Sequence, residues 1–142
     1  MANTAADDLM AVAGRWMEEG WQKGDAEAVI GLCSPGFVDH DPADRKPNRE
    51  GHAEGIRQLY GAFPDFHAVI EDRVVDVAAG RVTVRWSATG THRGTFLGAP
   101  PTGRLIAFKG IEIIRIEGGL IAERWGEWDG ISLLEQMGPP GG

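Results

Sequence analysis

Apolar residues recur at spacings of three and four along the first part of the chain, which is the period of an amphipathic helix. One such stripe runs from Leu9 to Gly20. A second helix is expected to begin at Asp25, whose carboxylate can cap the first turn, and to include Cys33. A third helix is expected over Arg49–Ala62. The N-terminal part of the chain is therefore predicted to be helical.

After Asp65 the apolar residues recur with period two, which is the period of a β-strand. Residues 66–78 and 81–94 are expected to form one antiparallel hairpin, and residues 104–117 and 120–129 a second. In the strand 81–94, valine and tryptophan alternate with polar residues. That alternation is typical of a strand with one buried face and one wet face.

Helices followed by a run of antiparallel strands predict an α+β fold, with the helices on the concave face of a curved antiparallel sheet. Such a sheet leaves a hydrophobic pocket between that face and the helices. The chain has 142 residues, enough for a single domain, 1–142, with a core of its own. The large side chains available to line the pocket are Trp16, Trp21, Tyr60, Phe63 and Trp86.

Composition and charge narrow the classes of function. The formal net charge is −7, which argues against a nucleic-acid-binding surface. The single cysteine, Cys33, fits a reducing compartment, and we expect it to be inert. No apolar run approaches the roughly 20 residues of a membrane span, and the first residues lack the pattern of a signal peptide. We therefore expect a cytoplasmic protein that binds neither nucleic acid nor membrane.

The last two strands are apolar on both faces. In the first of them, Ile111 and Ile113 lie on one face, and Ile114 and Ile116 on the other. In the second, the pattern places Ile121 and Trp125 on one face, opposite Leu120 and Ala122. Only one face can look into the pocket, and soluble proteins cover large apolar patches. The pattern therefore predicts a homodimer that packs through the convex face of the sheet.

Five segments carry a resemblance to a known family. They are "FVDHDP", "GIRQLYGAFPD", "WSATGTHRGTFLGAPPTGR", "IEIIRIEGGLIAERW" and "WDGISLLEQMG". In order and spacing they resemble the SnoaL-like polyketide cyclase family, which belongs to the nuclear transport factor two-like superfamily. The resemblance covers about residues 5–138, the expected ordered core, and implies a cone-shaped fold. In it, the "PPTG" segment is a strand-to-strand turn without a chemical role.

The resemblance also implies a reaction. The best-described members of the family close a ring in an aromatic polyketide ester by an intramolecular aldol reaction, without metal or cofactor. One base removes a proton between two carbonyls, and hydrogen-bond donors hold the enolate. We therefore expect a cofactor-independent cyclase that acts on a polyketide-like hydrophobic intermediate, by acid/base chemistry or by templated ring closure. The alternatives are a non-catalytic binding protein for a small hydrophobic molecule, and an epoxide hydrolase or isomerase using Glu112, Asp129 and Arg124.

The sequence departs from the family at the position of the acid/base. The aspartate of the cyclases corresponds to Gly126, and a histidine on the preceding strand corresponds to Glu112. Many relatives carry histidine where Arg124 stands. We expect Glu112 to replace the missing aspartate, because an apolar surrounding raises the pKa of a carboxyl group. The alternative is that Glu112 points to solvent or pairs with Arg115 or Arg124.

Two more residues are candidates for acid/base chemistry. His40 corresponds to a polar position near the family's pocket mouth and could carry a proton, or it could be a turn residue. Asp129 could reach the pocket mouth or cap the final helical turn. A metal site is not expected, because the adjacent residues Asp39, His40 and Asp41 would point to opposite faces of a strand.

The expected substrate-binding residues are polar and aromatic side chains, each with a structural alternative. Arg124 could bind a substrate carbonyl or neutralise Glu112. His92 could line the cavity or hydrogen-bond to backbone at the end of a strand. The aromatic residues could belong to the pocket wall or to the core. The complete set of substrate-binding candidates is His92, Arg124, Trp16, Trp86, Phe63 and Tyr60.

Overall fold

The N-terminal helices form where the apolar period predicts them. The computed structural model describes residues 4–138, so residues 1–3 and 139–142 of the expected domain lie outside the described part. Helix α1 (Ala5–Trp16) begins at Thr4, whose side chain and that of Asp7 form a capping box. It continues as a π-helical segment, η1 (Met17–Gln22). Helix α2 (Ala26–Leu32) begins at the predicted N-cap, where the Asp25 carboxylate accepts the Ala28 N–H at 3.1 Å.

The second helix ends earlier than predicted. Cys33 is the first residue of strand β1 (Cys33–Asp39) and not part of a helical turn. Pro35 restricts only Ser34, and the extended backbone of Cys33 accompanies its pairing with Ile121 near the C-terminal end of the chain. Burial raises the pKa of the Cys33 thiol to about 12, which makes it a poor nucleophile.

The remaining elements follow the predicted order. Helix α3 (Arg49–Ala62) has the predicted bounds. It is followed by β2 (His67–Asp76), β3 (Arg81–Thr91), β4 (Leu105–Glu117), β5 (Leu120–Trp128) and α4 (Gly130–Met137). No helix in the described part of the chain is long and apolar enough to span a membrane.

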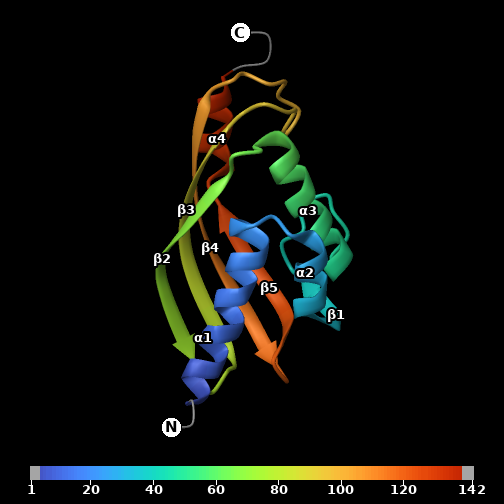
Figure 1. Ribbon diagram of the computed structural model, residues 1–142, viewed down its shortest axis with the longest axis vertical. Coiled ribbons are helices and arrows are strands. Elements are labelled where there is room, and N and C mark those ends of the chain that lie inside the picture. Colours follow the sequence, from blue (N-terminus) through green and yellow to red (C-terminus); the bar gives the residue numbers. More distant parts are fainter. Residues whose placement is uncertain (1–3, 139–142) are drawn as a thin grey trace.

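The strands form one curved sheet with the order β1-β5-β4-β3-β2. The three pairs from β2 to β5 are antiparallel, as the hairpin pattern predicts. Strand β1 adds to the β5 edge in parallel, with Asp39 opposite Arg124. The sheet is therefore mixed, and the fold is α+β as predicted. Figure 1 shows α1, α2 and α3 on one side of the sheet, and we call the sheet face that they cover the inner face.

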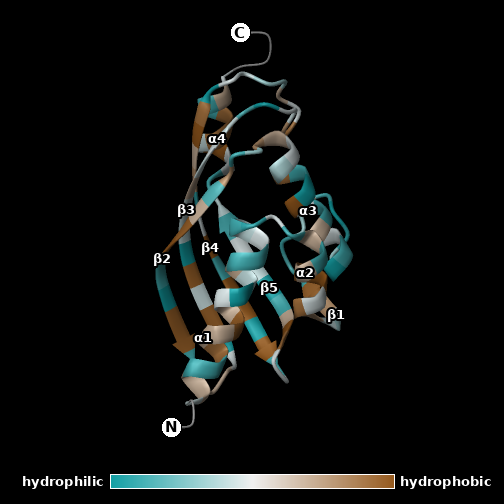
Figure 2. Ribbon diagram, viewed as in Figure 1, coloured by the Kyte–Doolittle hydropathy of each residue, from teal (hydrophilic) through white to brown (hydrophobic). Residues whose placement is uncertain are grey.

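Alternating side chains separate the inner face from the outer face. Figure 2 shows apolar and polar residues alternating along the central strands. Ile114 and Ile116 of β4 are buried on the inner face, whereas Ile111 remains 48% exposed on the outer face. The predicted faces of β4 are therefore confirmed. The inner face of β4 is the one that also carries Glu112.

The prediction that Ile121 and Trp125 share one face of β5 is wrong. Ile121 pairs with Ile116 on the inner face, whereas Trp125 pairs with Ile113 on the outer face. A register shift in the β4–β5 pair, between Arg115 and Ile116, separates the two residues. An extra residue in one strand reverses the alternation beyond it. The shift also turns Arg124 to the inner face, beside Ile114.

The outer face carries Ile111, one of the residues on which the dimer prediction rests, together with further exposed apolar residues. Exposed valine, leucine and isoleucine side chains lie there at positions Val69, Val74, Leu105 and Ile111. We expect sedimentation to give twice the mass of one chain. Val74→Lys should shift the equilibrium toward the single chain, because forming the dimer would remove the charge of the lysine from water. Val77→Lys is the control, since Val77 is also exposed but lies in the β2–β3 turn. A single-chain mass for the unmodified protein would contradict the prediction.

Candidate functional site

A pocket with a volume of about 170 Å³ opens between the inner face, helix α3 and the loops after β1 and β3. Six aromatic side chains contribute to its wall: Trp21, Phe66, Trp86, Phe96, Phe108 and Trp128. Its polar lining residues are Asp41, Asp44, Arg45, Gln58, Arg124 and Glu127. An aromatic wall with a few convergent polar groups is typical of a site for a small, flat, mostly apolar molecule.

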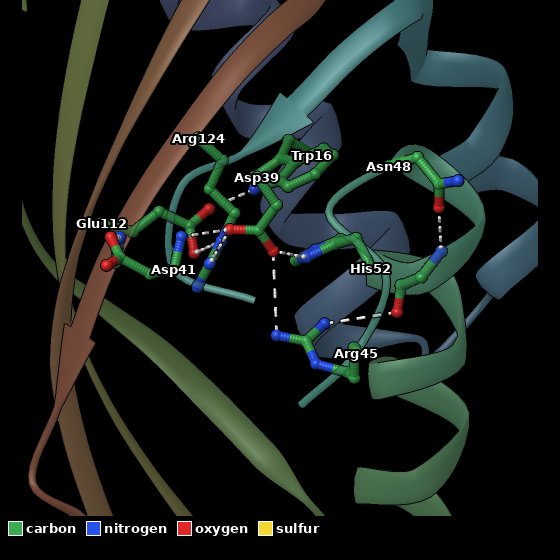
Figure 3. A network of polar contacts seen from close by, with 10 residues as sticks. Trp16, Asp39, Asp41, Arg45, Asn48, His52, Glu112 and Arg124 are labelled. Atoms are coloured by element: carbon green, nitrogen blue, oxygen red, sulfur yellow. Dashed lines mark hydrogen bonds and ion pairs between the residues drawn. The ribbon is translucent and has the colours of Figure 1, made fainter. Parts of the chain in front are cut away.

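Arg124 connects this pocket to a buried network of charges. Its Nε donates to Glu112 Oε2 at 3.3 Å, and its Nη1 donates to Asp39 Oδ1 at 3.0 Å. Figure 3 shows the three side chains pointing toward one another beside β5. Burial alone would lower the pKa of Arg124, but the two carboxylates outweigh it and raise that pKa. A permanent positive charge is thus fixed at the pocket wall.

Glu112 lies behind Arg124 and not in the pocket lining. Its side chain is 1% exposed, and both carboxylate oxygens have a donor. Oε1 accepts the indole N–H of Trp16, and Oε2 accepts Arg124. Of the alternatives given above for Glu112, the structure shows the ion pair with Arg124. Its carboxylate has no direct access to a molecule in the pocket.

Asp39 is the second anchor of the network. It projects inward from the end of β1, where Oδ1 also accepts the Asp41 N–H at 3.0 Å. Arg45 Nη2 lies 3.7 Å from Asp39 Oδ2, so one buried carboxylate holds two guanidinium groups that line the pocket. Burial favours a raised pKa for Asp39, but His52, Arg124 and the Asp41 N–H outweigh it and hold the pKa well below its usual range.

His52 completes the network from helix α3. Its ring stacks on Trp16 with centroids 4.7 Å apart, and its Nδ1 lies 3.6 Å from Asp39 Oδ2. Burial lowers the pKa of His52. The imidazole is therefore neutral near pH 7, since even an unperturbed histidine has a pKa of about 6.5.

Two side chains contact Gly126: Arg124 occupies the space where a Cβ would lie, and Asp41 accepts the backbone N–H. A Cβ on Gly126 would overlap the guanidinium of Arg124, lying 2.8 Å from its Cζ. The Gly126 N–H donates to Asp41 Oδ2 at 2.8 Å. Where the family carries its aspartate, this chain therefore has the guanidinium of Arg124 and, from the loop after β1, the carboxylate of Asp41.

His40 and Asp129 lie away from the pocket. His40 stacks on Trp125 of the outer face with ring centroids 4.7 Å apart, and its Nε2 contacts Glu123 Oε1 at 3.0 Å. It follows Asp39, which faces inward, so strand alternation turns it outward. Asp129 is the N-cap of α4, where its Oδ1 accepts the Ser132 N–H at 3.0 Å. The structure thus does not bring Asp129 together with Glu112 and Arg124.

Among the other substrate-binding candidates, Trp86 lines the pocket. Buried His92 stacks on Phe63, and its Nδ1 contacts Thr102 Oγ1 at 3.1 Å, which ties the "PPTG" loop to the end of β3. Phe63 belongs to the core, and the Tyr60 hydroxyl donates to the Trp21 carbonyl at 2.9 Å. These residues, like Trp16, support the pocket wall from behind.

Sequence reasoning missed three polar residues of the site: Asp39, Asp41 and Arg45. The sequence presents Asp39 and Asp41 only as candidate metal ligands, and Arg45 lies in a polar loop with no periodic pattern. The loop between β3 and β4 also contributes Phe96 and Leu97 to the pocket, although its "PPTG" part forms a turn. Phe108 could have been found, since it shares the inner face of β4 with Glu112 at an even spacing.

Comparison with known structures gives the same architecture. TsrD from Streptomyces laurentii is 25% identical, with a TM-score of 0.82 over 97% of this chain and 98% of that chain. A candidate polyketide cyclase from Bacillus cereus is 29% identical, with a TM-score of 0.79 over 94% and 82% of the two chains. IdmH from Streptomyces antibioticus, also named as a candidate polyketide cyclase, is 29% identical, with a TM-score of 0.76 over 92% and 99%.

Sequence comparison identifies the family directly. A search among curated proteins found no significant match. The sequence profile of the SnoaL-like polyketide cyclases, however, matches residues 11–137, which include every strand, α2–α4 and the pocket. This chain therefore belongs to the SnoaL-like polyketide cyclase family.

Proposed function

We propose that this protein is a cofactor-independent cyclase that closes a ring in an uncharged, polyketide-like aromatic intermediate. The observation that carries the proposal is the guanidinium of Arg124, held by two buried carboxylates and presented to an aromatic-lined pocket. A fixed donor of this kind stabilises negative charge that develops on a carbonyl oxygen, because it needs no reorganisation during the reaction.

The reaction needs a base, an oxyanion donor and a folded substrate. A base removes the proton from a carbon between two carbonyls, and Arg124 holds the enolate oxygen. That carbon then bonds to a second carbonyl carbon of the same molecule, and the resulting alkoxide takes back one proton. Product and substrate are isomers. The aromatic wall contributes by holding the chain with its reacting carbons in contact.

The charges around the pocket favour an uncharged substrate. Arg124 is already paired with Glu112 and Asp39, and Arg45 also contacts Asp39. Asp41 and Asp44 add two further acidic residues to the lining, whereas the Glu127 side chain lies on the outer face beside Ile111. A substrate with a free carboxylate would meet excess negative charge, whereas an ester or ketone would not.

The test is stereoselective ring closure of an aryl β-ketoester that carries a pendant ketone, followed by chiral chromatography. We expect the protein to accelerate closure and to enrich one enantiomer, whereas uncatalysed closure gives both. Arg124→Lys keeps the charge but loses the planar fork, and we expect a rate loss of about 100-fold. Arg85→Lys on the exposed outer face is the matched control. Retention of the unaltered compound would contradict the proposal and indicate a binding protein.

A further inference from the structure

We propose that the carboxylate of Asp41 is the catalytic base of the pocket and takes the place of the side chain that Gly126 lacks. The inference rests on the proposed function, because it names the group that removes the substrate proton. It assigns the role to the loop after β1, whereas the family pattern places the acid/base on β5.

The first observation is position. Asp41 Oδ2 accepts the Gly126 N–H at 2.8 Å, so the carboxylate lies within one hydrogen bond of the backbone at that position. Asp41 also lines the pocket, whereas Glu112 does not. The base and the oxyanion donor are therefore neighbours, because the Arg124 guanidinium fills the space where a Gly126 side chain would begin.

The second observation is the pattern of contacts on the Asp41 carboxylate. Oδ2 is held by Gly126, and among the described residues Oδ1 has no hydrogen-bond or ion-pair partner. The Asp41 backbone is fixed in turn, since its N–H donates to the buried Asp39. One oxygen thus orients the group, and the other is available to accept a proton.

The charged groups that line the pocket with Asp41 are Arg45 and Asp44 from its own loop, and Arg124 from β5; Glu127 touches the pocket, but its carboxylate lies on the outer face beside Ile111. Arg124 and Arg45 are engaged by Asp39, and Arg124 also by Glu112. Asp41 forms no ion pair with either arginine. No guanidinium therefore occupies the Asp41 oxygen that faces a substrate proton.

The experiment uses 5-nitrobenzisoxazole, a flat aromatic probe that opens when a base removes its single C3 proton. The electron pair of that C–H bond forms the nitrile, the N–O bond breaks, and its electrons leave on the phenolate oxygen. The proton passes to the carboxylate, so no oxidant or metal is needed. The coloured phenolate reports the rate, and the probe labelled with deuterium at C3 reports whether C–H cleavage limits it.

We expect the protein to open the probe faster than acetate at equal concentration, with a primary isotope effect. Asp41→Asn keeps an oxygen for the Gly126 N–H but removes the base, so the rate should fall by about 100-fold. Asp41→Ser, whose hydroxyl can also accept that N–H, is the second variant and should lose the rate similarly. Asp25→Asn is the matched control, because asparagine caps α2 as well as aspartate does.

A purely structural role for Asp41 predicts a different result. The rate with folded Asp41→Asn or Asp41→Ser would then stay within about threefold of the unmodified protein, which overturns the proposal. Rates no greater than acetate for the unmodified protein also overturn it. These outcomes are separate from the ring-closure test, which depends on Arg124 and on product stereochemistry. Loss of ring closure with an intact Asp41-dependent probe reaction would refute the proposed function alone.

Discussion

Replacement of Arg124 by methionine is expected to lower the free energy of unfolding by about 3–5 kcal/mol. The reason is that the replacement leaves two buried carboxylates without the guanidinium that they share. Glu112 and Asp39 are each 1% exposed, and Arg124 donates to both. Asp39 would keep Arg45 at 3.7 Å, but Glu112 would keep only the indole N–H of Trp16, so the cost of a buried unpaired charge falls mainly on Glu112.

Urea denaturation at pH 7 measures this loss. The double variant Glu112→Gln with Arg124→Met removes one of the stranded charges and should recover part of the stability. Arg85→Met is the control, because Arg85 pairs with Asp72 on the exposed outer face and should contribute no more than about 1 kcal/mol. Equal losses for Arg124→Met and Arg85→Met would show that the buried network does not stabilise the fold.

Stability is also expected to fall with acid in a way that depends on Asp39. The pKa of Asp39 is held below its usual range, with burial opposing the shift and His52, Arg124 and the Asp41 N–H producing it. A carboxyl group with a lowered pKa stabilises the fold above its unfolded pKa of about 3.9. That contribution is lost as the pH falls through the folded value.

The contribution of ionised Asp39 is measured by comparing the free energy of unfolding of the unmodified protein with that of Asp39→Asn at several pH values. At pH 7 the variant leaves Arg124 and Arg45 without their shared partner, and we expect a loss of about 3 kcal/mol. Below about pH 4 the difference should shrink, because the unmodified protein then begins to lose the same contribution. His52 causes a separate loss of stability in acid, because burial lowers its pKa and the unfolded chain takes up that proton first, from about pH 6.5 downward. A difference that is independent of pH would exclude an ionised Asp39 as the anchor.

The order and type of the secondary-structure elements could be predicted from the sequence because their signals are local. The bounds of α3, the N-cap at Asp25 and the two hairpins follow from period, capping residues and turns. The order of helices before strands also predicts helices on one face of a curved sheet, and the resemblance to the family adds the cone shape. The predicted end of α2 at Cys33 is wrong because Cys33 is extended where it pairs with Ile121 of β5, a contact between distant segments.

The faces of β5 depended on an interaction that has no local signal. A register shift in its pairing with β4 separates Ile121 from Trp125 and turns Arg124 inward. The parallel addition of β1 then sets Asp39 against Arg124 and leaves His40 outside. Whether a side chain on these strands reaches the pocket therefore depends on pairing between distant segments, which sequence period alone does not contain.

The sequence by itself determined which chemical groups this protein has: an aromatic-rich inner face, Glu112 and Arg124 on adjacent strands, and a glycine in place of the family's aspartate. Only the tertiary structure decided which of these groups reach the pocket. Burial forced Glu112 to pair with Arg124 and Trp16, because a charge removed from water needs a partner. The loop after β1 brought Asp41 to the backbone N–H of Gly126, and that contact joins residues 85 positions apart in the chain.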